Sequence, residues 1–286
     1  MNEPSWRHHY IPEFYLDGFT SDKGMFKIYD IKTKRFKNNG QDYSPRSHFF
    51  EKNGNSWISG NLIDDKQETR YFSKIDNNVA KIFRRINNSN AQDKFNVTDD
   101  DTAMLQYFVG IMYWRIPTNY TEIKNILKRK ELKELGLISN KIDIYSNIDI
   151  KEFEDKLKED KNFFKMMKFW LPNISFSEIF DCSTPLHIIP FIKDFPAVCS
   201  DNPVISRDPT RFRVYNDNFI FPLNDTNVFF RGNKIKKLNR ETKMLIDTIT
   251  YKQALEFVSC TDEKYLDQLD FFYAKNFGSV LKVRMG

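Results

Sequence analysis

The order of helix-like and strand-like segments constrains the fold of this chain most. Apolar residues recur at helical spacing through the middle of the sequence, whereas short apolar runs between Asn, Asp and Pro turns lie toward its ends. Helices are expected at 12–19, 64–86, 98–115, 118–135, 150–159, 161–170, 239–257 and 261–271, and strands at 25–30, 35–37, 47–50, 186–192, 197–200, 219–223, 227–231 and 279–283. This order predicts one α+β domain over 1–286, with a mixed or antiparallel sheet built from N- and C-terminal segments and a helical insertion at about 64–170.

Composition favours a cytoplasmic globular protein. The 286 residues include 27 Phe, which is enough apolar material to form a core without disulfides. The three cysteines form no Cys-x-x-Cys pair, as is typical of a reducing compartment. No run approaches the roughly 20 apolar residues of a membrane helix, and the N-terminus lacks a signal-peptide pattern. We therefore expect a cytoplasmic protein without membrane contact.

Three charged residues fall on faces of helices that should be buried. On the helix expected from residue 64, Glu68 lies in the middle of the apolar arc and Asp76 lies at its edge. On the next helix, Arg115 projects beside Phe108 on the apolar stripe. A buried guanidinium needs carboxylate partners, for which Glu68, Asp76 and Asp201 are the candidates. The pattern fits either a functional site or an ion pair that only joins two helices.

Polar residues also mark a strand end and the N-terminus. Asp201 and Asn202 follow the strand expected at 197–200, where they could form an ordinary Asx turn or a site on a rigid support. His8 and His9 stand side by side before Pro12. Histidine exchanges a proton near neutral pH, although a ring that pins the backbone is the more common role.

A basic stretch lies between residues 226 and 243. Its cations, set against a single acid, are Arg231, Lys234, Lys236, Lys237, Arg240 and Lys243. Such a local excess could follow a phosphate backbone, but a solvated hairpin is the interpretation that we favour. The sequence contains no phosphate-binding glycine loop, no dinucleotide fingerprint, no Gly-x-Ser-x-Gly elbow and no zinc spacing, so it lacks the motifs of the common nucleotide, hydrolase and zinc enzymes.

Several segments together resemble one known family. They are the opening His9-Tyr10-Ile11-Pro12-Glu13-Phe14-Tyr15-Leu16, Asp76 within its helix, Arg115-Ile116-Pro117, Ser200-Asp201-Asn202-Pro203, Phe221-Pro222-Leu223 and Phe257-Val258. In this order they are similar to a mainly bacterial family catalogued as domain of unknown function 4238. The resemblance spans nearly the whole chain. It implies a single domain and places His9, Asp76, Arg115 and Asp201 in one site.

Two functional hypotheses follow. The first is a metal-dependent nuclease or phosphoesterase-like effector, such as a bacterial toxin or an anti-phage defence component. Asp76, Asp201 and Glu68 would bind Mg²⁺ or Mn²⁺, His9 would be the general acid or base, and Arg115 would stabilise charge on phosphate. His8, Asn202, Arg231, Lys234, Lys236 and Lys237 would bind the nucleic acid. The alternative is a non-catalytic module that binds an anion, a nucleotide or a protein partner encoded nearby.

Overall fold

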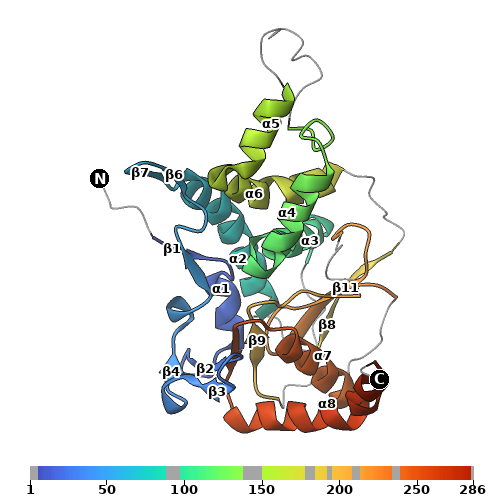
Figure 1. Ribbon diagram of the computed structural model, residues 1–286. Helices are drawn as coiled ribbons and strands as arrows, with labels where there is room; N and C mark the ends of the chain where they lie inside the picture. The colour runs from blue at the N-terminus through green and yellow to red at the C-terminus, as the bar shows by residue number, and fades with distance from the viewer. Residues whose placement is uncertain are drawn as a thin grey trace.

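The computed structural model describes residues 6–87, 97–137, 150–177, 184–191, 195–207, 213–233 and 239–284. The fold is α+β, as predicted, and every pair of neighbouring strands is antiparallel. Figure 1 shows helices α4, α5 and α6 gathered at one end of the molecule and α8 running along the other. None of the described helices is long and apolar enough to cross a membrane.

Two larger sheets organise the body of the protein. The first has the order β10 (Ile205–Ser206), β11 (Phe219–Pro222), β12 (Asn227–Arg231) and β8 (Leu186–Pro190). The second has the order β3 (Arg35–Phe36), β2 (Phe26–Asp30), β13 (Phe257–Cys260) and β9 (Val198–Ser200), with β4 (Asp42–Tyr43) also paired to β2. Because β2 pairs with β13, segments from the two ends of the chain share one sheet.

Two small antiparallel pairs complete the strand structure. In the first, β1 (Arg7–His9) pairs with β5 (Phe50–Lys52) and positions the two histidines. In the second, β6 (Trp57–Ser59) and β7 (Leu62–Asp64) form a hairpin of their own. Figure 1 shows this hairpin projecting beside α6.

The helices follow the expected capping and packing rules. They are α1 (Glu13–Leu16), α2 (Ser73–Asn87), α3 (Asp99–Arg115), α4 (Tyr120–Arg129), α5 (Ile150–Glu159), α6 (Lys161–Ser177), α7 (Arg240–Lys252) and α8 (Glu263–Arg284). Thr98 and Asp101 form a capping box at the start of α3. The helix ends at Arg115 because Ile116, which precedes Pro117, is extended.

An aromatic core joins the N-terminal motif to both the helices and the sheet. Tyr15 is fully buried, stacks on Phe221 of β11, and donates a hydrogen bond to the Pro222 carbonyl at 2.7 Å. Phe83 of α2 and Phe108 of α3 pack against the same ring. The opening motif therefore has a structural role, since its aromatic residues bring α1, α2, α3 and β11 together.

Several predicted segments were wrong in whole or in part. The strand expected at 47–50 begins only at Phe50, after a 3-10 turn at Pro45–Ser47, and the helix expected at 118–135 ends at Arg129. The helix expected from residue 64 begins at Gln67, as a π-helical turn, because 62–64 pairs with β6. The helix expected at 239–257 ends at Lys252, and Phe257 opens the central strand β13. The strand expected at 279–283 lies within α8. Short apolar runs carry no periodicity that separates a strand from a buried helix, so their pairing decides the outcome.

Candidate functional site

Arg115 lies at the centre of a buried polar network at the end of α3. Its side chain is 1% exposed. Nη1 donates to both carboxylate oxygens of Asp76, at 3.0 and 3.2 Å, and Nη2 donates to the His9 carbonyl at 2.6 Å. The guanidinium also lies over the Phe72 ring. Arg115 therefore ties α2 and α3 to the strand that carries the histidines.

Asp76 is the carboxylate that faces Arg115. Burial raises its pKa, while the adjacent guanidinium opposes that rise through its charge and its hydrogen bonds. An ion pair of this kind stays favourable when both members are hydrogen-bonded, and removing one member strands the other. The ion pair joins α2 and α3, and both oxygens of the Asp76 carboxylate already accept hydrogen bonds from Arg115.

His8 and His9 have different surroundings. His8 is buried, and its Nδ1 accepts a hydrogen bond from the backbone N–H of Asn55 at 3.0 Å. The Asn55 side chain in turn donates to Glu68 at 2.8 Å. The His9 ring is only partly buried and packs edge-on against Phe50. Burial, aided by the Arg115 charge, lowers the pKa of His9 to about 4, so this ring is neutral at pH 7.

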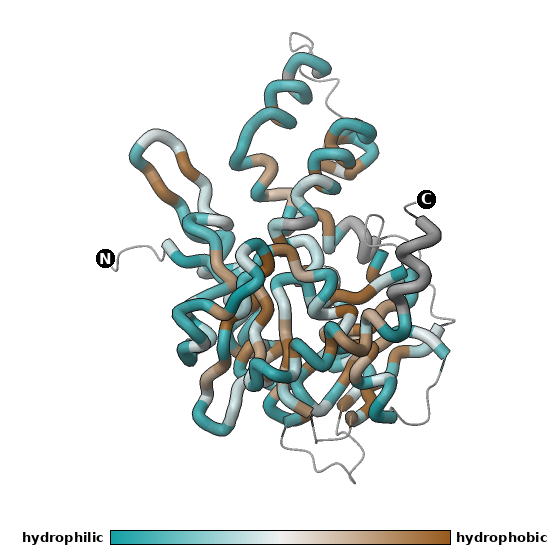
Figure 2. Tube along the Cα trace, turned by 60° about the horizontal axis from the view of Figure 1, so that its bottom comes forward, coloured by the Kyte–Doolittle hydropathy of each residue, from teal (hydrophilic) through white to brown (hydrophobic). Residues whose placement is uncertain are grey.

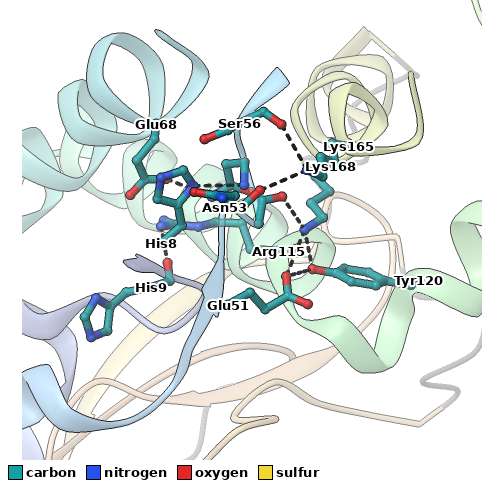
Figure 3. A network of polar contacts seen from close by, with 12 residues as sticks. His8, His9, Glu51, Asn53, Ser56, Glu68, Arg115, Tyr120, Lys165 and Lys168 are labelled. Atoms are coloured by element: carbon teal, nitrogen blue, oxygen red, sulfur yellow. Dashed lines mark hydrogen bonds and ion pairs between the residues drawn. The ribbon is translucent and has the colours of Figure 1, made fainter. Parts of the chain in front are cut away.

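A second buried cation, Lys168 on α6, lies in the same region (Figure 3). Its side chain is 2% exposed. Nζ donates to the Gly54 carbonyl at 3.1 Å, to Glu51 at 3.2 Å and to the Tyr120 hydroxyl, which itself donates to Glu51. Burial lowers the pKa of Lys168 to about 8, although the Glu51 charge offsets part of this effect.

Lys165 extends the same contact one turn earlier on α6. Its Nζ donates to the Asn53 carbonyl at 2.9 Å and to the Ser56 carbonyl at 3.0 Å. Together the two lysines bind three backbone carbonyls within residues 53–56, the loop from which the β6–β7 hairpin starts. We call residues 53–56 the hairpin base. Figure 3 shows both lysine side chains pointing into this loop.

Sequence reasoning did not identify Lys165 and Lys168. A signal was present, however, because Lys168 follows Phe164 by four residues and adjoins the buried Met167. A lysine on the apolar face of a helix indicates a buried partner in the same way as Arg115 does. Glu51 and Tyr120 carried no comparable signal, because their role depends on the fold.

Asp201 has separate surroundings. Its carboxylate accepts the backbone N–H groups of Leu255, Glu256 and Phe257, at 3.0, 2.6 and 2.9 Å. Burial raises its pKa and these three donors oppose the rise. Asn202 holds the same loop through Gln253. None of the described hydrogen bonds or ion pairs joins Asp201 to Arg115 or Asp76, so the arrangement gives Asp201 a structural role at the start of β13.

The three candidate metal ligands face different partners. Asp76 contacts Arg115, Glu68 contacts Asn55, and Asp201 accepts backbone N–H groups. Within the described residues, no group of three or more His, Cys, Asp and Glu side chains could hold a metal ion. These residues therefore do not fit a shared Mg²⁺ or Mn²⁺ site. Of the basic stretch, Arg231 lies buried in β12, while Lys234, Lys236 and Lys237 fall outside the described residues.

The network as a whole pairs its charges internally. Arg115 is balanced by Asp76, and Lys168 is balanced by Glu51. Its hydrogen bonds hold backbone carbonyls at His9 and in the hairpin base. Such an arrangement positions chain segments.

Comparisons with known proteins give one match. The search of curated proteins and the search of solved structures found none. A sequence profile described as "Protein of unknown function (DUF4238)" matches residues 7–261, a range that holds the histidines, Asp76, Arg115, Lys168 and Asp201. The chain belongs to the DUF4238 family.

Proposed function

We propose that this protein is a partner-binding module and that the β6–β7 hairpin is its recognition element. Seven large hydrophobic side chains are exposed among the described residues, and four of them lie on this hairpin: Trp57, Ile58, Leu62 and Ile63. Leu62 is 69% exposed. A concentration of exposed apolar side chains on one projecting element is typical of an interaction site. Figure 2 shows the brown, hydrophobic stretches on the hairpin that projects at the upper left.

A groove beside the hairpin supports a protein as the partner. It has a volume of about 380 Å³ and lies between Trp57 and the neighbouring Tyr71, Met166 and Phe169. Asp64, Lys66 and Gln67 complete its lining. A lining that combines aromatic and Met side chains with a few polar groups is typical of protein interfaces. A membrane surface would favour a basic lining, whereas this lining carries one acid and one lysine.

The buried network serves this function by fixing the hairpin. Lys165 and Lys168 bind the hairpin base, as described above. Asn162 adds a third contact, because its side chain accepts from the Ile58 N–H at 2.9 Å and donates to the Ile58 carbonyl at 2.8 Å. An isolated two-stranded hairpin is only marginally stable, so these contacts from α6 preorganise the apolar surface.

Site-specific photocrosslinking tests this proposal. A photoreactive benzoylphenylalanine replaces Leu62 in one variant and Leu255, which is 54% exposed, in a matched control. After irradiation of cells that naturally express the protein, we expect a discrete protein adduct at position 62 and none at position 255. The same adducts at both positions, or none at position 62, would refute a hairpin-directed interaction.

The nuclease hypothesis is the second candidate, and His9 is the observation that favours it. This imidazole is neutral at pH 7 and feels the Arg115 and Glu68 charges, so it could accept a proton as a weak general base. The test is incubation of the purified protein with RNA and DNA, with and without Mg²⁺ or Mn²⁺. Cleavage that is lost in His9→Ala would support it, and intact nucleic acid in every reaction would reject it.

A further inference from the structure

The two strands of the β6–β7 hairpin differ in what lies along their outer edges. In an antiparallel pair, residues opposite each other alternate between two kinds of pair. In one kind the two residues bond to each other, and in the other their N–H and C=O groups point away from each other. Ile58 and Ile63 are opposite each other at the middle of the hairpin. The kind of pair that they form therefore decides which backbone groups each outer edge presents.

The contact with α6 shows how the Ile58 backbone is oriented. Asn162 accepts the Ile58 N–H and donates to the Ile58 carbonyl, so both groups point out of the hairpin toward α6. The side-chain amide occupies the place that a neighbouring strand would have. Ile58 and Ile63 thus form a pair without mutual hydrogen bonds. It follows that the Ile63 N–H and C=O point out of the hairpin on its other side.

The outer edge of β7 is open and apolar. In the part of the chain that the structure describes, β7 pairs with β6 alone, and none of the described hydrogen bonds outside the sheet involves the Ile63 backbone. Proteins usually protect such an edge with charged residues, proline or a covering segment. The β7 edge instead carries Leu62 and Ile63, which are 69% and 39% exposed. Figure 2 shows that the hairpin projects from the body of the protein.

We infer that the partner of the hairpin contributes an extended strand that pairs with the outer edge of β7. The inference rests on the proposed function, because it specifies the kind of segment that the hairpin recognises. The Ile63 N–H and C=O bond one residue of this strand, which is the mode of recognition known as β-augmentation. The third strand also stabilises a two-stranded hairpin that is marginal by itself.

The faces of the hairpin define one side chain of the partner strand. Leu62 is opposite Ser59, two residues after Trp57, so Leu62 and Trp57 lie on the same face. Trp57 lines the groove next to α6. The partner residue opposite Leu62 points to this face and lies about 5 Å from it. We therefore expect a large apolar residue there, adjacent to the partner residue that bonds Ile63.

Amide hydrogen exchange in the free protein tests the open edge without a partner. Labelling with ¹⁵N-isoleucine observes Ile58 and Ile63 together, so each is a matched control for the other. Relative to their intrinsic rates, we expect Ile58 to exchange at least about tenfold more slowly than Ile63, the factor for one hydrogen bond. Asn162→Ala should remove this difference. Equal protection of the two amides in the parent protein would overturn the inference.

Photocrosslinking from position 62 tests whether the partner uses this edge. Ile63→Pro removes the outward N–H and breaks no hydrogen bond within the hairpin. Ile63→Thr is the matched control, because it removes the same apolar side chain and retains the N–H and a β-branched side chain. We expect Ile63→Pro to lower the yield of the adduct at least about tenfold relative to Ile63→Thr. Slow exchange of the Ile58 amide in both variants verifies that the hairpin is intact.

A measurement on the unsubstituted protein covers the case in which proline opens the hairpin. Addition of the purified protein that crosslinks at position 62 should slow exchange of the Ile63 amide at least about tenfold. An unchanged Ile63 rate, or equal adduct yields in Ile63→Pro and Ile63→Thr, would overturn the pairing with β7 and leave the hairpin as an interface. The absence of an adduct at position 62 of the parent is a different result, because it refutes the proposed function itself.

Discussion

The Lys168→Met substitution tests the energetics of the buried network most sharply. Met keeps the length of the side chain and removes its charge. Burial lowers the pKa of Lys168 from 10.5 to about 8. At about 1.4 kcal/mol per pKa unit, this shift means that folding disfavours the ammonium by roughly 3 kcal/mol relative to the ammonium of the unfolded chain.

The sign of the pH effect follows from proton binding. Below pH 8 the amine is protonated in both the folded and the unfolded protein, and the burial penalty is fully present. Between pH 8 and 10.5 the unfolded chain binds more protons at Lys168 than the folded protein does, so the free energy of unfolding rises with pH. From pH 7 to pH 10 the parent protein should therefore gain about 2.5 kcal/mol relative to Lys168→Met.

Urea unfolding at pH 7 and pH 10 measures this difference. Other titrating groups contribute equally to the parent and the variant, so their effects cancel in the comparison. Lys161→Met, a charge removal at an exposed position of the same helix, is the control and should show no such pH dependence. An equal stability difference between parent and Lys168→Met at both pH values would refute the reasoning.

Three further predictions concern stability. Asp201→Ala leaves three N–H groups of residues 255–257 without their acceptor and should lower the free energy of unfolding by about 3 kcal/mol. Urea titration measures this loss, with Asp22→Ala at an exposed position as the control. A loss below about 1 kcal/mol would contradict a structural role. The pKa of His9 is about 4 in the folded protein and 6.5 in the unfolded chain, so below pH 6.5 the unfolded chain binds the proton more readily. Between pH 7 and pH 5 the free energy of unfolding of the parent should therefore fall by about 2 kcal/mol relative to that of His9→Phe. Parallel pH profiles of the two proteins would contradict this. Asp247→Ala strands Lys243, its buried partner at 2.6 Å, and should cost about 3–5 kcal/mol. The double variant Lys243→Met/Asp247→Leu should recover most of that loss in melting temperature, whereas a double variant no more stable than Asp247→Ala would argue against the stranded-charge explanation.

Local sequence patterns were sufficient for much of the secondary structure. The strand at 227–231 has the predicted bounds, and the helix α3 begins and ends where its capping residues and Pro117 indicate. The β13 strand could not be predicted in this way, because the apolar run at 257–260 becomes a strand only through pairing with β2 and β9. Its partners are distant in sequence, so no local periodicity identifies it.

The candidate site likewise has features that local sequence indicates and features that depend on contacts between distant segments. The position of Arg115 on an apolar helix face predicted a buried carboxylate partner, and Asp76 occupies that place. Asp201 was also a candidate partner of Arg115, and the motif resemblance placed it in the same site. Its carboxylate instead accepts N–H groups of a loop that only the folded chain brings to it. The hairpin at 57–64 was not predicted, since three-residue strands are too short to show alternation.

The most direct test of the hairpin interaction compares two tryptophans of similar exposure. Trp57 is 45% exposed on the hairpin, and Trp6 is 48% exposed outside it. The dissociation constant of the protein that crosslinks at position 62 is measured with Trp57→Ser and with Trp6→Ser. We predict that Trp57→Ser weakens binding at least about 30-fold, as for a hot-spot residue, and that Trp6→Ser has an effect of at most about threefold. Equal affinities for the two variants would contradict the proposal that the hairpin recognises the partner.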